Sequence, residues 1–591
     1  MIMKKVFTLI LSFCLLLGCI IPVSAAWNAK EKFSAMTADF VPELKHDAYS
    51  VVEEIITGTL SLIQRAIPDR LNAQEISRHQ SENFYPGTRD LLKEPAKRSF
   101  WSLGYASASL VPSDWREHTY YLGGFIGIEN RFTNKLEEVI DDMRVRAIAL
   151  SDGSGRGVSL FATVDAIGVS NKDIRAIREI VAQEAEKQGI ELNAVNVCST
   201  HCHSCIDTQG LWTNLFQKGF KNLFAALTGL YEMESGTDDA YMAFLRTTVA
   251  DAMIHALGNM TPGKLSYAVK DIGKEYFSNK NRRSANALPS ELHRFLFTPE
   301  DPAVRSTVIA NFGAHPDVAG LPTKTNSGRA LSGDFVYYIG DELEKHGFNF
   351  MFFNGAIAGI YTGREPSSDG LDLKYRYQIS ERYGREIAKI LMAMTLTREQ
   401  IEDSDLYDAE TIEKERAASS GGYTLWCENW IPSQERELRP LLNIRLKEVT
   451  ITVTNPLILL AGKLKLANYD IFKDNKGKYK IVTEIGYLCL DDVPAVLVPG
   501  ELVTDLYAGG KSLTKFGSVN RRDFRYEPLK KLFGESTLCF GLANDAIGYI
   551  VPDNDYMFVI FDDHYQESIS LGAGTASAIM AGFSALADEI A

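Results

Sequence analysis

Residues 145–203 alternate between short apolar segments and a charged amphipathic segment, and this alternation is the feature that most constrains the fold. Two apolar runs, 145–150 and 158–164, flank the turn Asp152-Gly153-Ser154-Gly155, which predicts a β-hairpin. A charged segment with helical periodicity follows over roughly 172–188, and an apolar run at 193–197 comes after it. This strand, helix and strand order predicts an α/β fold in which flanking helices pack on a mixed, layered sheet core.

The last of these apolar runs leads into two closely spaced histidines, His201 and His203. The chain has ten histidines among its 591 residues, so a pair at this spacing is unusual. In an extended backbone, residues i and i+2 point to the same side. Two imidazoles that converge where a strand gives way to a loop predict a catalytic metal site.

Further loops place polar side chains at the ends of apolar runs, where α/β folds commonly carry their sites. The strand-to-loop transitions are expected at 304–313, 348–353 and 495–498, and the polar residues are His315, Glu501 and Tyr549, with Tyr565 a little beyond. Each is a weak signal alone, because a histidine before a proline is more often a turn residue and a glutamate near a helix start is more often a cap.

Together these motifs resemble those of the neutral/alkaline, non-lysosomal ceramidase family. The family's Thr-His-Thr-His-Ser motif is similar to residues 200–204, its His-Pro motif to 314–316, and its Val-Pro-Gly-Glu-x-x-Thr motif to 498–504. The order and spacing match from about Ser102 to the C-terminus. The resemblance therefore implies a ceramidase-like catalytic domain over residues 101–591.

The resemblance also implies a Zn2+ ion and a set of residues around it. The ligands would be His201, His315, Glu501 and Tyr549. His203 would be the general acid/base, and Tyr565 would donate its hydroxyl hydrogen to the substrate carbonyl. The family's arginine would be Arg282, with the neighbouring Arg283 as the alternative. Two imidazoles and a carboxylate form a common hydrolytic zinc set that leaves a position for water. The implied reaction is hydrolysis of the N-acyl amide bond of ceramide or a related lipid amide, which gives a fatty acid and an amine.

The chain departs from the family's motifs at three places. Cys205 follows Ser204 where the family has Gly-Pro, and Thr362 in the loop 359–363 stands where the family has a functionally important serine. The chain stops soon after Tyr565, so we expect no C-terminal immunoglobulin-like domain.

Two alternatives to a ceramidase stay open: a zinc hydrolase of a different acyl amide or ester, and a non-catalytic surface lipoprotein that retains a hydrolase-like fold.

Three cysteines interleave with the histidine pair. Cys198, Cys202 and Cys205 have the C-x3-C-x2-C spacing of a radical-SAM iron–sulfur site. An exported chain is a poor setting for an oxygen-sensitive cluster, so the thiols are expected instead to bind a metal structurally, to form one bridge, or to have no special role.

The N-terminus has the features of a secretory signal over residues 1–26. Lys4 and Lys5 precede an apolar run at 6–21 and a small-residue cleavage region. The segment Leu16-Leu17-Gly18-Cys19 also matches a lipobox, so we expect a secreted or extracytoplasmic protein that is either cleaved near Ala25 or lipid-anchored through Cys19. Residues 27–100 carry apolar side chains at helical spacing and predict a helical N-terminal extension.

Composition narrows the expected partners. Without the two signal lysines, 60 basic residues face 76 acidic ones, a net charge of −16, which argues against nucleic-acid binding.

The apolar segment 208–245 is either a packing helix or a lid or lipid-contacting element. We expect a lipid amide or other small amphipathic substrate, together with peripheral membrane contact or a lipid anchor; the oligomeric state is not predicted.

Overall fold

The computed structural model describes most of the chain. The described residues are 42–72, 83–124, 134–280, 283, 290–319, 329–363, 373–406, 426–427, 429–558 and 564–591. The expected signal, the lipobox cysteine Cys19 and Arg282 lie outside the described residues.

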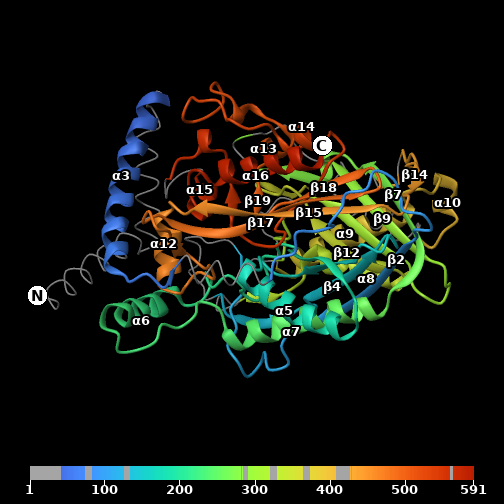
Figure 1. Ribbon diagram of the computed structural model, residues 1–591, viewed down its shortest axis with the longest axis horizontal. Helices are drawn as coiled ribbons and strands as arrows, with labels where there is room; N and C mark the ends of the chain where they lie inside the picture. The colour runs from blue at the N-terminus through green and yellow to red at the C-terminus, as the bar shows by residue number, and fades with distance from the viewer. Residues whose placement is uncertain are drawn as a thin grey trace, which may run out of the picture.

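A nine-stranded mixed sheet forms the centre of the molecule (Figure 1). In spatial order its strands are β12 (Asn349–Asn354), β10 (Thr307–Phe312), β9 (Glu291–Pro299), β7 (Thr261–Asp271), β2 (Trp101–Ser109), β4 (Arg144–Ser151), β5 (Val158–Val164) and β6 (Leu192–Ser199), and β14 (Glu435–Glu437) pairs with β7. The antiparallel pair β4–β5 is the predicted hairpin. Helix α5 (Asn171–Lys187) then connects β5 to the parallel strand β6, which confirms the predicted strand, helix and strand order.

A second, six-stranded sheet stacks on the first. Its strands are β1 (Leu71–Asn72), β16 (Phe472–Lys473), β17 (Tyr479–Leu490), β18 (Val493–Leu497) and β20 (Leu538–Phe540), and β15 (Leu442–Thr452) pairs with β17. Side chains from both sheets share one buried cluster, for example Leu103 and Ile148 from the first and Ile444 and Leu488 from the second. Full burial of each such side chain stabilises the fold by about 1.5–3 kcal/mol.

Helices cover the outer faces of both sheets and complete four layers (Figure 1). The nine-stranded sheet is covered by α5, α7 (Asp239–Gly258), α8 (Asp334–Lys345) and α9 (Leu373–Ala393), and the six-stranded sheet by α13 (Thr504–Ala508), α14 (Leu529–Phe533) and α16 (Thr575–Ile590). In α5 the buried side chains Ile174, Ile177, Val181 and Ala185 follow helical spacing, so one stripe faces the sheet. The expected α/β class with a layered sheet core is confirmed.

The predicted N-terminal extension is helical only in part. Helix α3 (Pro42–Ala66) packs through Ile63, together with Ile67 just beyond its end, against α12 (Pro456–Lys463) and α6 (Leu215–Thr228) at one end of the molecule (Figure 1). The helix ends before Pro68, a residue that disfavours helical backbone in its predecessor. Residues 83–100 lie in an irregular path along β15, because Gly87 and Thr88 pair with its backbone.

Short elements at the strand ends build the rest of the fold. They include β3 (Leu136–Val139), β8 (Phe277–Asn279), β11 (Arg329–Leu331), β13 (Ile360–Thr362), β19 (Glu501–Leu502), β21 (Tyr549–Ile550), α10 (Arg398–Glu402) and α15 (Tyr565–Ile569). Three pairs of these strands form two-stranded sheets: β11 with β3, β13 with β8, and β19 with β21. Among the helices of the described residues, none combines the length and the apolar character needed to cross a bilayer.

Candidate functional site

His201 follows strand β6 and has an unusual backbone conformation. Its φ angle is 66°, in the left-handed region that few non-glycine residues adopt. The side chain is buried, and Nδ1 donates a hydrogen bond of 2.8 Å to the carbonyl oxygen of Ile167. Backbone strain of this kind costs of order 1–3 kcal/mol and concentrates at functional sites.

His315 comes just after β10, which lies near the opposite end of the strand order from β6 in the same sheet. Its Nδ1 donates a hydrogen bond of 2.7 Å to the carbonyl oxygen of Ile360, the first residue of β13. The ring of Tyr361 stacks on the His315 ring, with centroids 4.7 Å apart. His315 is therefore fixed both by a hydrogen bond and by an aromatic face.

Asn354, at the end of β12, joins the two histidine loops. Its Nδ2 donates to the carbonyl oxygens of Thr200 at 2.8 Å and of Ala314 at 2.9 Å, while its Oδ1 accepts from the Ala314 amide at 3.1 Å. The backbone amide of His203 also donates to the carbonyl oxygen of Pro316, at 2.9 Å. These bonds hold the turns that carry His201 and His315 at a fixed separation.

Glu501 and Tyr549 enter the site as partners in the short parallel sheet of β19 and β21. Both side chains are buried, and the Glu501 charge acts on the Tyr549 hydroxyl. Gly548, just before Tyr549, lets this segment pack against α15, since its φ is 76° and a Cβ there would lie 2.2 Å from the carbonyl oxygen of Ile569. Burial and the Glu501 charge raise the pKa of Tyr549 well above its usual value, so the phenol is protonated at neutral pH.

The Glu501 carboxylate faces both anchored imidazoles. Its Oε2 lies 3.1 Å from Nε2 of His315 and 3.3 Å from Nε2 of His201. Burial alone would raise the pKa of Glu501, but the two imidazoles outweigh it and lower the pKa to about 2. The carboxylate is therefore ionised at neutral pH although it is buried.

The three side chains fit a cation. Because a carbonyl oxygen only accepts, the Nδ1 atoms of His201 and His315 carry protons, and the Nε2 atoms of both rings face Glu501. Lone pairs that face a carboxylate repel it unless a proton or a metal ion lies between them. Ligands at about 2.0–2.2 Å in a tetrahedral zinc site lie about 3.4 Å from one another, close to the distances found here. Backbone carbonyls on the far ring nitrogens are the usual support of metal-bound histidines.

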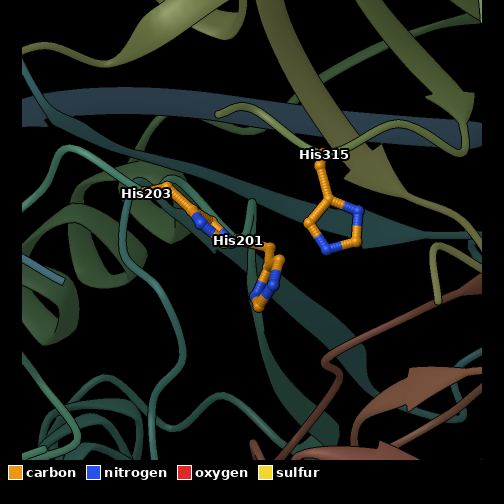
Figure 2. A group of neighbouring side chains, drawn as sticks. All are labelled: His201, His203 and His315. Carbon is orange, nitrogen blue, oxygen red and sulfur yellow. The ribbon is translucent and has the colours of Figure 1, made fainter. Parts of the chain in front are cut away.

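His203 lies beside this group. Its ring centroid is 4.7 Å from that of His201 and 5.4 Å from that of His315, and Figure 2 shows the three imidazoles gathered from the two loops. The candidate ligand atoms of these three histidines lie within 4.8 Å of one another, so they form a geometric alternative to the set that contains Glu501. Burial, and then the nearby His201, His315 and Arg329, lower the pKa of His203 well below its usual value, which keeps the imidazole neutral.

The other residues implied by the resemblance have different positions. Tyr565 begins α15 and is half-buried, with its ring centroid 6.0 Å from that of Tyr549. Thr362 lies in β13, next to Tyr361, and is buried; among the described residues its Oγ1 has no hydrogen-bond partner. Loop 359–363 thus contacts His315 through Ile360 and Tyr361.

Of the two arginines that could match the family's arginine, the structure describes only Arg283. Arg282 lies outside the described residues. Arg283 is buried, with Nε donating to Asp555 Oδ2 at 2.7 Å and its other nitrogens bound to Glu567 and Gln566. Because Glu567 and Gln566 belong to α15, Arg283 fixes the helix that carries Tyr565.

The three cysteines of the C-x3-C-x2-C motif do not converge. Cys198 belongs to the core between the two sheets, whereas Cys202 and Cys205 belong to the core under the helices on the opposite face. A cluster bound by all three thiols is therefore incompatible with this fold.

Three residues of the site are absent from the sequence-based expectation: Asn354, Tyr361 and Arg329. Arg329 donates to the carbonyl oxygens of His203 at 2.6 Å and Gly123 at 2.8 Å. Asn354 had a usable signal, since it directly follows the expected strand 348–353 and precedes a glycine. Tyr361 lies in the loop 359–363 that the sequence singles out for Thr362, whereas Arg329 stands in no recognisable motif.

The fold of this chain is similar to that of solved ceramidase structures. The neutral ceramidase from Pseudomonas aeruginosa superimposes with a TM-score of 0.52 at 13% identity, over 83% of this chain and 75% of that one. A ceramidase complexed with C2 gives a TM-score of 0.53, also at 13% identity, with the same shares of the two chains. No family model and no curated protein matches the chain. The chain therefore has a neutral-ceramidase-like fold.

Proposed function

We propose that this protein is a zinc-dependent amidohydrolase that cleaves the N-acyl amide bond of ceramide or a related lipid amide. The products would be a fatty acid and a sphingosine-type amine. The observation that carries the proposal is the buried Glu501 carboxylate, held 3.1 and 3.3 Å from the Nε2 atoms of His315 and His201. The neutral-ceramidase-like fold supports the choice of substrate class.

His201, His315 and Glu501 would hold the ion, and the Tyr549 hydroxyl would complete the set or orient Glu501. A bound zinc ion would supply a water of lowered pKa and would polarise the scissile carbonyl. No other residue in the site needs to carry a permanent charge for this chemistry. The ionised Glu501 offsets part of the positive charge that the buried histidines would otherwise meet.

His203 is the proposed general acid/base. A neutral, buried imidazole can accept a proton from the attacking water and then donate it to the departing amine nitrogen. Its fixed backbone, tied to Pro316 and Arg329, keeps the ring beside the two anchored histidines. Proton transfer by a positioned side chain typically contributes about 10²–10⁴-fold to rate.

Tyr565 is the proposed donor to the substrate carbonyl oxygen. A phenol that donates to this oxygen stabilises the negative charge that develops as water adds to the carbonyl. Arg283 would act at a distance, because it binds the helix that carries Tyr565. Thr362 and Arg282 are proposed to contact the substrate, Thr362 through its buried hydroxyl.

Lipid contact is the proposed setting of the reaction. Helix α6 buries Leu223 against α3 and α12 but exposes Phe224, and the turn after it exposes Leu230 and Tyr231 by 69% and 63%. Exposed aromatic and aliphatic side chains on one element favour the membrane interface where lipid amides reside. With the signal-like N-terminus, they support a secreted or extracytoplasmic protein with peripheral membrane contact or a lipid anchor at Cys19.

The test is a substrate panel given to the purified full-length chain. N-acyl sphingosines, other fatty amides and fatty esters of matched chain length would be presented in mixed micelles, before and after metal chelation and zinc return. We expect release of fatty acid and amine from the lipid amides, lost with chelation and restored by zinc. The His203→Ala variant provides a control with the same surface, and His118→Ala an exposed-histidine control.

The panel also separates the alternatives. Hydrolysis confined to esters or to short amides would assign the site to a different acyl substrate. One zinc per chain without turnover of any member would favour the non-catalytic lipoprotein.

A further inference from the structure

Cys202 and Cys205 flank the turn that carries His203. Residues 203 and 204 form a hydrogen-bonded turn, and the Cα atoms at the two ends of such a turn lie less than about 7 Å apart. Disulfides bridge Cα atoms about 4.4–6.8 Å apart, so the turn brings the two cysteines into bridging range. Both side chains are fully buried.

The two sulfur atoms point to the same place. Cys202 Sγ donates to the carbonyl oxygen of Ser332 at 3.1 Å, and Cys205 Sγ donates to the same oxygen at 3.6 Å. The side chain of Ser204 supplies a third donor to this oxygen, at 2.8 Å. Loss of both thiol hydrogens would therefore leave the buried carbonyl satisfied by Ser204.

The remaining cysteines of the described residues have other surroundings. Cys198 faces the core between the sheets, Cys427 lies in the core beneath α8 and α9, and Cys489 donates to the carbonyl oxygen of Asp491. Cys539 belongs to β20 and lies in the core between the six-stranded sheet and the helices that cover it. Within this part of the chain, the shared acceptor distinguishes the pair Cys202 and Cys205.

We propose that Cys202 and Cys205 form a disulfide that closes the turn bearing the general base His203. In the bond-forming step, one thiolate attacks a disulfide oxidant such as glutathione disulfide and releases one glutathione thiol. The second cysteine then attacks the mixed disulfide and releases the other. The protein loses two protons and two electrons, and the oxidant takes them up to become two thiols. The bond would form during folding in an oxidising compartment, before the thiols are buried.

The bridge has a consequence for the metal site. Thiolates are strong zinc ligands, and a C-x-x-C pair beside two histidines would compete for the ion while the chain folds. In the folded chain both sulfur atoms face Ser332, whereas His201 and His203 face the site. A disulfide would remove the competing thiolates without removing a proposed ligand, so zinc content should be equal in the oxidised and the reduced folded protein.

The test is thiol mapping of the full-length chain exported to a bacterial periplasm. Thiols would be blocked by alkylation under denaturing conditions, and peptides would be identified by mass before and after reduction. We expect the peptide with Cys202 and Cys205 to take label only after reduction, while Cys427 and Cys539 take label at once. In a Cys202→Ser variant, Cys205 should become labelled before reduction.

The proposal is overturned if both cysteines are labelled in the exported protein and again after refolding with glutathione disulfide. It is also overturned if either cysteine is bridged to another partner, or if reduction of the folded protein raises its zinc content. Because none of these measurements depends on turnover, the disulfide can fail while the proposed amidohydrolase stands, and the reverse.

Discussion

Replacement of Glu501 by glutamine tests the proposed metal centre most directly. Glutamine keeps the volume and one oxygen of the side chain but removes the charge. In the structure the carboxylate is buried and ionised, with a pKa of about 2, and it faces the Nε2 atoms of His315 and His201. Tyr549 stays protonated because burial and then the Glu501 charge raise its pKa, so Glu501 supplies the charge of the proposed ligand set.

The expected loss follows from the number of ligands. Four-ligand structural zinc sites in peptides bind with apparent free energies of about 10–16 kcal/mol, an average of about 2.5–4 kcal/mol for each ligand. At about 1.4 kcal/mol for each factor of ten, Glu501→Gln should weaken zinc binding roughly 10²–10³-fold. Because Glu501 is the charged ligand of the proposed set, its replacement should weaken zinc binding by close to 10³-fold, the upper end of this range.

The assay is a competition titration of the metal-free full-length chain with a chromophoric zinc chelator at neutral pH. Thermal unfolding of the same samples would show that the variant is folded. The matched control is Glu437→Gln, on the exposed strand β14, where the side chain pairs with Lys264 and should leave the zinc affinity unchanged.

A folded Glu501→Gln protein that binds zinc within a factor of about three of the wild type would refute the reasoning, since a lost ligand costs at least about tenfold. The three-histidine group, with His203 as a ligand, would then be the better assignment.

Three further predictions test other parts of the molecule. His203→Ala should keep zinc and lower turnover about 10²–10⁴-fold, and loss of zinc in this variant would make His203 a ligand. Burial raises the pKa of Asp545 from 3.8 to about 7, so the folded state keeps a proton that the unfolded state releases and stability falls as pH rises across that window. Urea unfolding should therefore show Asp545→Asn gaining up to about 3 kcal/mol over the wild type between about pH 5 and about pH 8, and a constant difference would contradict this. Glu484 is fully buried between Arg175 and Arg178, at 3.0 and 2.7 Å, so Glu484→Ala should lower the unfolding free energy by about 3–5 kcal/mol. A loss below about 1 kcal/mol in a denaturant titration would show that the two guanidinium groups find other partners.

Periodicity in the sequence determined the secondary structure around the site. The hairpin of β4 and β5, helix α5 and strand β6 all form where alternating and helical patterns predict them, because these patterns record which face of a segment is buried. The helical extension was predicted too long, since the pattern ahead of Pro68 does not continue over residues 83–100. Those residues gain their hydrogen bonds from β15, a partner more than 300 residues away in the chain.

The sequence by itself also determined which loops carry imidazole, carboxylate and phenol groups at strand ends, because each motif is local. Tertiary structure alone decided how these groups meet. The pairing of β19 with β21 places Glu501 against Tyr549, and Asn354 joins the loops of His201 and His315. Arg283 is held by Asp555 and Glu567, and the thiols of Cys202 and Cys205 share one carbonyl oxygen. These contacts join segments that are far apart in the chain, and their geometry depends on the packing of the whole fold.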